Sequence, residues 1–386
     1  MSGSQVLGLL FNLYLYHDDV VISSCLRFSK APFIRPLSFL IQHMGQHWDI
    51  VNIDKLQRIS IYKLGEALPS PLNFDQLLVT PIFLPLHCTK ASLYATVVNL
   101  NGDPSRGLGR LELPEDVIHC IFDQINDLDD AICFSLSHRR LRIVGRHHVF
   151  TLLALEKASS SWIGDRLICI GGETEDLPGD LLTPAEEQAL QSWTEEDLQQ
   201  YNEEQGLELT FEDTNTFDVS GSLVGRSREI DPEEPRITSR GISRLRRGRL
   251  RELDAFEILL QPKYHSRHPW ILCNFSKRVY VRLDALAKLA GREIETSETP
   301  LFNSLCGFAH VLLSRISWSS RSSTAMSYKG KLHRGVWAGD RFEILTMDRL
   351  DRHREKDEWA DISAEVVKEL RAIWKSEFGK NWKQEV

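Results

Sequence analysis

The sequence predicts an α+β protein, in which a short helical module precedes a mixed strand and helix domain that ends in an amphipathic helix. Directly after Pro114, apolar residues recur at helical spacing, which is typical of a helix with one buried face. Short apolar runs bounded by turn residues lie at 161–170 and 270–282 and indicate strands. Residues 361–379 return to helical spacing. A chain of 386 residues, 42% of them hydrophobic, is long enough for two or three domains.

Composition along the chain predicts three regions. Residues 1–110 have no clean period and many prolines, so we expect a poorly defined N-terminal region. The glycine-rich stretch 101–109 indicates a linker at its end. The helical module then covers 111–150 and the mixed domain 160–386. Within that domain we expect a charged, partly disordered insert at about 195–252.

The module carries the clearest helical pattern of the chain. Pro114 suits the first turn of a helix, and two acidic residues after it suit the positive end of the helix dipole. Asp127 or Asp129 can cap a second helix, and Ser137 a third. The apolar face of the first helix consists of Val117, Ile118, Ile121, Phe122 and Ile125.

In the mixed domain the pattern changes from helical to strand-like. We expect a buried strand within 161–170 and a hairpin at 270–282, followed by a short helix at 284–290. The uniformly apolar run 308–318 predicts a buried strand. The last helix has Asp361 or Ser363 as its cap, and a glycine ends it.

One segment of this domain occurs twice. Trp162-Ile-Gly-Asp-Arg-Leu-Ile-Cys-Ile returns as Trp337-Ala-Gly-Asp-Arg-Phe-Glu-Ile-Leu. Two copies are too few for a solenoid or a propeller. We therefore expect two equivalent strands in one domain, each entered through a Gly-Asp turn.

Charge is distributed in blocks rather than evenly. The net charge of −8 hides fifteen acidic residues and no Lys or Arg between 167 and 225, and seven Arg with no acidic residue at 236–251. The Arg block lacks the interleaved aromatic residues that stack on bases, so nucleic acid is an unlikely partner. A solvated loop that pairs with the acidic block and a nuclear localisation signal stay open alternatives.

The cysteines and the N-terminus bear on the compartment. Seven Cys without CxxC spacing indicate reduced thiols in a cytoplasmic or nuclear protein. The apolar run 6–16 is too short to span a bilayer, and we expect no membrane association.

No motif with catalytic spacing occurs, so we expect no enzyme, no catalytic residue and no cofactor. His and Cys residues gather between 119 and 148, but their spacing is not that of a metal site, and no metal is expected. Cys169 is more typical of a core than of a nucleophile. The paired Asp165-Arg166 and Asp340-Arg341 are more typical of turn and strand ends than of a substrate clamp.

The segment from Leu113-Pro-Glu-Asp to Ser-Leu-Ser-x-Arg-Arg-Leu141 resembles the F-box. Beyond 150, Trp162-x-Gly-Asp-Arg, Asn274-Phe-Ser-Lys and related pieces resemble uncharacterised F-box-like proteins of mushroom-forming fungi. The resemblance implies a module that binds a Skp1-like adaptor of a cullin-type ubiquitin ligase, while the mixed domain presents an unknown target protein. The positions that fit the family pattern are Leu113, Pro114, Ile121, Phe122, Leu128, Leu136 and Arg139.

The partner-binding residues that we expect all lie in the module. A docking helix needs apolar anchors that its own fold leaves exposed. The alternative is an autonomous globular protein that binds a small ligand or nucleic acid, with the three helices packed internally. Exposure of Leu113, Ile118 and Ile121 would favour docking, and their burial would favour the alternative. The expected anchors are Leu113, Pro114, Ile118, Ile121 and Leu128.

Overall fold

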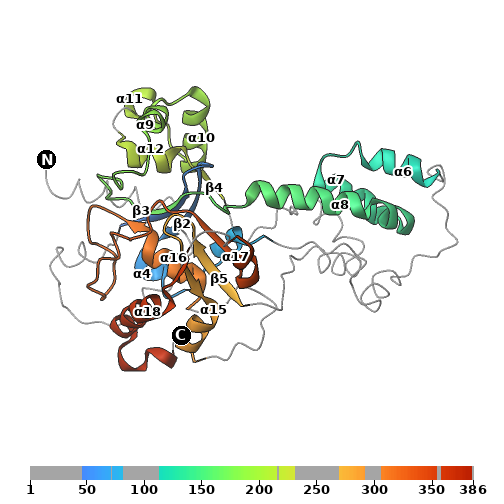
Figure 1. Ribbon diagram of the computed structural model, residues 1–386. Helices are drawn as coiled ribbons and strands as arrows, with labels where there is room; N and C mark the ends of the chain where they lie inside the picture. The colour runs from blue at the N-terminus through green and yellow to red at the C-terminus, as the bar shows by residue number, and fades with distance from the viewer. Residues whose placement is uncertain are drawn as a thin grey trace, which may run out of the picture. The chain divides into compact units, whose positions relative to one another are not determined.

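A computed structural model gives the structure of this chain (Figure 1), and it describes residues 46–70, 72–80, 113–214, 217–230, 269–291, 306–353 and 358–384. Helices and mixed sheets occur together, so the predicted α+β class is confirmed. The strands are β1 (Trp48–Asn52), β2 (Gln57–Tyr62), β3 (Leu167–Gly171), β4 (Arg228–Glu229), β5 (Trp270–Asn274), β6 (Val279–Arg282), β7 (Ser317–Trp318), β8 (Phe342–Thr346) and β9 (Ala360–Asp361).

The helices fall into three groups, which belong to the module, to the acidic segment and to the rest of the mixed domain. The module holds α6 (Glu115–Phe122), α7 (Leu128–Ser137) and α8 (Arg139–Ser160). The acidic segment holds α9 (Pro184–Gln191), α10 (Glu195–Gln205), α11 (Phe211–Thr214) and α12 (Val219–Arg226). The others are α4 (Leu64–Ala67), α15 (Leu283–Leu289), α16 (Phe308–Ile316), α17 (Met347–His353), α18 (Ser363–Phe378) and the 3₁₀ helices η1 (Phe74–Leu78) and η3 (Gly379–Gln384).

The strands form two sheets that share a four-stranded arrangement, and the first sheet has β7 as a fifth strand, parallel to β3. In the first sheet, β1 lies between β2 and β3, both antiparallel to it, and β4 runs parallel to β2. In the second sheet, β5 lies between β6 and β8, again both antiparallel, and β9 runs parallel to β6. Trp and Asn bound both central strands, at Trp48 and Asn52 in β1 and at Trp270 and Asn274 in β5. The chain therefore contains one four-stranded arrangement twice.

The repeated Trp-x-Gly-Asp-Arg segments enter equivalent strands, β3 and β8, which confirms that prediction. Gly164 and Gly339 have φ of 74° and 85°, a conformation that favours glycine. Their N–H groups donate across the two sheets, Gly164 to the Phe342 carbonyl at 2.9 Å and Gly339 to the Leu167 carbonyl at 2.8 Å. The two repeats thus join through a reciprocal exchange of backbone hydrogen bonds.

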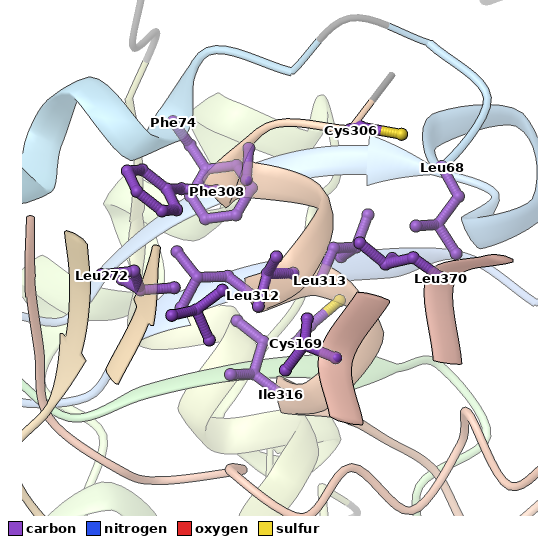
Figure 2. Packing of buried hydrophobic residues seen from close by; sticks show 14 of the residues in the cluster. Leu68, Phe74, Cys169, Leu272, Cys306, Phe308, Leu312, Leu313, Ile316 and Leu370 are labelled. Carbon is purple, nitrogen blue, oxygen red and sulfur yellow. The ribbon is translucent and has the colours of Figure 1, made fainter. Parts of the chain in front are cut away.

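The main core lies between the two sheets and takes the inward side chains of both. Figure 2 shows Cys169 of β3 and Leu272 of β5 around α16, whose Leu312 and Leu313 lie at the centre, with Leu370 of α18 beside them. Separate clusters cover the outer faces, where α9 and α12 pack on the first sheet and α17 on the second. Each sheet is therefore buried on both sides, which fits its apolar strands.

Four predictions about the mixed domain need correction. Residues 308–316 form α16 rather than a strand, because every side chain of this helix is buried and no polar face reveals the helical period. Residues 48–62, predicted to lie in a separate N-terminal region, form β1 and β2 of the first sheet. Within the predicted insert, residues 195–214 and 217–229 contain α10, α11, α12 and β4, and residues 231–252 lie outside the described residues. The module also extends past 150, because α8 ends at Ser160.

Other predictions are confirmed or lie outside the described residues. The hairpin of β5 and β6, the helix α15 and the terminal helix α18 form where they were expected. The N-cap of α18 is Ile362 rather than the expected Asp361 or Ser363, although the Asp361 carboxylate accepts the N–H of Ser363 at 2.9 Å. The linker at 101–109, the apolar run at 6–16 and the Arg block at 236–251 lie outside the described residues.

The module is an insertion into the first repeat. The N–H of Trp162 donates to the carbonyl of Leu77 at 2.8 Å, so the chain returns beside the point where it left the domain. In the second repeat, Trp337 makes the same bond to Arg315 at 2.8 Å. The mixed domain is therefore built from residues on both sides of the module.

Candidate functional site

Two of the three helices of the module, α7 and α8, have side-chain caps at their starts, whereas α6 follows Pro114 without one. The carboxylate of Asp127 accepts the N–H of Asp130 at 2.9 Å at the start of α7, as expected. At the start of α8 the cap is His138, whose Nδ1 accepts the N–H of Arg140 at 3.1 Å. The expected cap, Ser137, instead donates to the Phe134 carbonyl at 2.7 Å.

The module has apolar clusters of its own. One joins α6 to α8 and contains Ile118, Phe122, Leu141 and Val144. The other joins α7 to α8, and its fully or partly buried members come only from residues 125–153. Gly145 allows this packing, since a Cβ at that position would lie 1.8 Å from the Phe122 ring. The helices therefore pack against one another without apolar side chains from the sheets.

Two polar contacts fix α6 on α8. The Arg140 guanidinium donates to the Leu113 carbonyl at 2.9 Å, just ahead of α6. Behind α6, His148 Nε2 lies 2.7 Å from the Ile125 carbonyl. Both ends of α6 are thus held, and its outward face is presented in one orientation.

The five predicted anchors divide into two groups. Pro114 is exposed, and Leu113 and Ile121 are partly exposed. Ile118 and Leu128 are only 1% and 8% exposed, so they stabilise the module and are not available as contacts. The reason is that the apolar residues of α6 cover more than one face, and the packing on α8 takes one of them. Of the three residues that distinguish docking from internal packing, Ile118 is buried as the alternative expects, and Leu113 and Ile121 are partly exposed as docking expects.

Sequence reasoning did not separate Val117 from the buried face of α6. Its side chain is 42% exposed, and with Pro114 and Ile121 it forms an apolar stripe at spacing i, i+3 and i+7. We call these three residues the α6 stripe. The signal was the helical position of Val117, which lies away from the buried pair Ile118 and Phe122.

The paired Asp and Arg residues lie at the junction of the repeats and act structurally. Asp165 and Asp340 each accept from the amide of the Asn that ends the neighbouring strand, at 2.8 Å from Asn52 and 2.7 Å from Asn274. A lysine completes each set, with Lys277 Nζ 2.7 Å from the Asp340 carboxylate. Asn and Lys side chains of the two repeats thus engage both carboxylates.

The two arginines share one acid. Asp54 accepts from Arg166 Nε and from Arg341 Nη1, both at 2.8 Å. Partial burial alone would raise the pKa of Asp54, but the hydrogen bonds from Arg166 outweigh it and lower the pKa. Arg166 also binds Glu186 at 2.6 Å, and this hydrogen bond lowers the pKa of Glu186 to about 2. The cluster is a fixed ionic junction.

Ser60 of β2, Asp49 of β1 and His47, which directly precedes β1, come together in a combination that the sequence did not reveal. Ser60 Oγ lies 2.8 Å from His47 Nε2, and Asp49 Oδ2 lies 3.5 Å from the same nitrogen. The hydrogen bond to Asp49 raises the pKa of His47. In a hydrolytic triad the acid holds the opposite ring nitrogen, so that Nε2 is free to take the serine proton. This geometry therefore does not build a proton relay.

Three further features bear on function: the thiol of Cys169, candidate metal ligands and candidate membrane spans. Cys169 is fully buried, and burial raises the pKa of its thiol, as for a core residue. Across the described ranges, no group of three or more His, Cys, Asp or Glu residues has the geometry to hold a metal ion. Among the helices described, none combines the length and apolar character needed to cross a bilayer.

Comparison with protein families, with curated proteins and with solved structures finds no match for this chain. The resemblance to the F-box therefore stays a prediction. Within the described residues, the α6 stripe gives the module a regularly spaced apolar surface. Such a surface suits the binding of another protein.

Proposed function

We propose that the chain is an adaptor whose module docks a Skp1-like protein, while the mixed domain presents a target protein to a cullin-type ubiquitin ligase. The α6 stripe carries this proposal. Pro114, Val117 and Ile121 stay open to solvent although Ile118 and Phe122, next to them on the same helix, are buried. An apolar row at helical spacing is the surface that a groove on a partner protein recognises.

The construction of the module supports docking without refolding. Its clusters join α6 to α8 and α7 to α8, and the Arg140 and His148 contacts fix both ends of α6. A preordered helix loses little conformational entropy when it binds, which favours affinity. The place of the module within the first repeat then ties the partner to the mixed domain at two chain connections.

The proposal predicts that replacing Val117 and Ile121 together with Ser weakens binding of Skp1 by about tenfold or more, because the loss of two apolar anchors costs at least about 1.4 kcal/mol. The measurement is a titration of purified full-length chain with Skp1, beside co-purification from cells. Since neither residue lies in the buried core, the variant should keep the unfolding midpoint of the wild type within a few degrees.

Leu155 offers a matched control. It is 62% exposed on α8 and lies outside the α6 stripe, so Leu155→Ser removes a similar apolar area without touching the proposed contact. Binding should then be unchanged. Wild-type affinity in the Val117 and Ile121 variant, or no binding of Skp1 by the wild type, would contradict the proposal.

A further inference from the structure

A groove of about 490 Å³ lies in the acidic helical segment, along α10 and the residues that follow it. It is open to solvent along its length. One wall comes from α10, and the other comes from residues 207–211, which turn back beside that helix. This groove is separate from the α6 stripe and shares no residue with it.

The second wall is fixed by its own hydrogen bonds. Gly206 ends α10 with φ of 62°, which reverses the chain. The Asn202 side chain then forms two hydrogen bonds with the backbone of Leu209. It donates to the Leu209 carbonyl and accepts the Leu209 N–H, both at 2.9 Å. Thr210 and Asp213 continue the fixed conformation, since the Thr210 N–H donates to the Asp213 carboxylate at 2.8 Å. The groove is therefore preformed.

The lining combines apolar surface with negative charge. Leu207 and Phe211 both line the groove, and their side chains are 46% and 44% exposed. Single exposed apolar residues are ordinary, but two that face one concave surface indicate a contact. Three glutamates share the lining, and no Lys or Arg does. Those glutamates are Glu195, Glu203 and Glu208.

The charge of the groove is not neutralised by the helices around it. The segment from 167 to 225 contains no Lys or Arg at all. Arg226, the first base after it, pairs with Asp197 at 3.1 Å, outside the lining. In the described part of the chain, no ion pair involves Glu195, Glu203 or Glu208. An occupant of complementary charge is therefore cationic.

We propose that this groove binds a basic segment of a partner protein, with an apolar side chain of the segment held by Leu207 and Phe211. Its Lys or Arg side chains pair with Glu203 and Glu208 on the rim. This binding is independent of docking through the α6 stripe. Because the charges are exposed, affinity falls as salt rises. The same complementarity speeds association and excludes acidic segments.

The test uses the full chain and short synthetic peptides of alternating Arg and Leu, followed by fluorescence anisotropy. Control peptides carry Glu in place of Arg, or Ser in place of Leu. Glu203→Lys combined with Glu208→Lys should weaken binding of the Arg-Leu peptide by about tenfold or more. The same variant should bind the Glu-Leu peptide better than the wild type does. Leu207→Ser with Phe211→Ser should weaken binding of the Arg-Leu peptide.

Two matched variants control for nonspecific effects. Glu196→Lys reverses an exposed charge on α10 outside the groove, and Val336→Ser removes an apolar side chain that is 61% exposed elsewhere. Both should bind like the wild type. The proposal fails if the wild type binds the Glu-Leu peptide as tightly as the Arg-Leu peptide. It also fails if the groove variants bind no more weakly than these controls.

Discussion

Asp54 stands where the second repeat has Ser276, and this single difference changes how the junction is held. Both side chains accept a backbone N–H at the entry of the next strand, Asp54 from Arg166 at 2.8 Å and Ser276 from Arg341 at 3.0 Å. Only the carboxylate can also pair with the two guanidinium groups. Asp54 therefore accepts the backbone hydrogen bond and also forms two ion pairs.

Substitution at this position should separate the two roles. Asp54→Ser keeps the acceptor for Arg166 N–H and loses the ion pairs, so we expect unfolding free energy to fall by about 1–2 kcal/mol. Asp54→Ala loses both and should cost about 1 kcal/mol more. Glu66→Ser is the control, since its ion pair with Lys63 is exposed and should contribute under about 0.5 kcal/mol. Equal stability of the Ser and Ala variants in urea titrations would refute the distinction.

Among the helices and strands, α16 shows where hydrophobic periodicity cannot distinguish a helix from a strand. A strand was predicted because an unbroken apolar run fits a buried strand as well as a buried helix. A residue of another element accepts a backbone hydrogen bond at the N-terminus of α16. The buried carboxyl of Asp75 in η1 accepts the N–H of Ala309. Sequence spacing cannot reveal such a contact. Helices with one wet face, such as α18, were predictable because their polar side chains mark the period.

Two buried groups at α16 titrate in opposite senses. Burial raises the pKa of Asp75 to about 7, although hydrogen bonds from backbone N–H groups oppose this shift. The folded chain therefore binds this proton more tightly than the unfolded chain does. As a result, the folded state loses stability as pH rises from about 4 to about 7. Burial lowers the pKa of His310 to about 4, so the imidazole binds a proton less readily in the folded chain than in the unfolded chain. The folded state therefore loses stability as pH falls from about 6.5 to about 4.

Single substitutions should expose each slope. Relative to the wild type, Asp75→Asn should gain stability as pH rises through this window, by up to about 4 kcal/mol. His310→Gln should gain relative stability as pH falls. Urea unfolding at about pH 5 and about pH 7.5 measures both differences. Parallel pH profiles for the wild type and the two variants would contradict the assignment.

For the whole molecule, the repeated Trp-x-Gly-Asp-Arg segment is a small part of a larger structural repeat. Trp162 and Trp337 were visible because the Gly, Asp and Arg that follow them are identical in the two segments. The equivalence of β1 with β5 depends on Trp and Asn alone, so only the pairing of the strands makes it evident. The assignment of residues 48–62 to a separate N-terminal region was wrong for the same reason, since β3, one of the two partners of β1, lies beyond the module. Long-range pairing is not encoded in local spacing.

The helical spacing within 113–128 was predictable, but the buried face of the helix was not. Residues 115–122 form α6 and Leu128 begins α7, and the side chains of Ile118 and Leu128 turn inward. Which face of α6 is buried depends on α8, whose length of 22 residues the sequence did not indicate. Gly145, which receives the Phe122 ring, decides that packing and carries no periodic signal.

Docking of a Skp1-like protein by the module is the central proposal, and hydrogen–deuterium exchange of the full chain with and without Skp1 tests it most directly. We expect slower exchange in α6, around Pro114, Val117 and Ile121, and unchanged exchange in the strands of both sheets. Unchanged exchange throughout α6 at saturating Skp1, or protection confined to the mixed domain, would contradict the proposal.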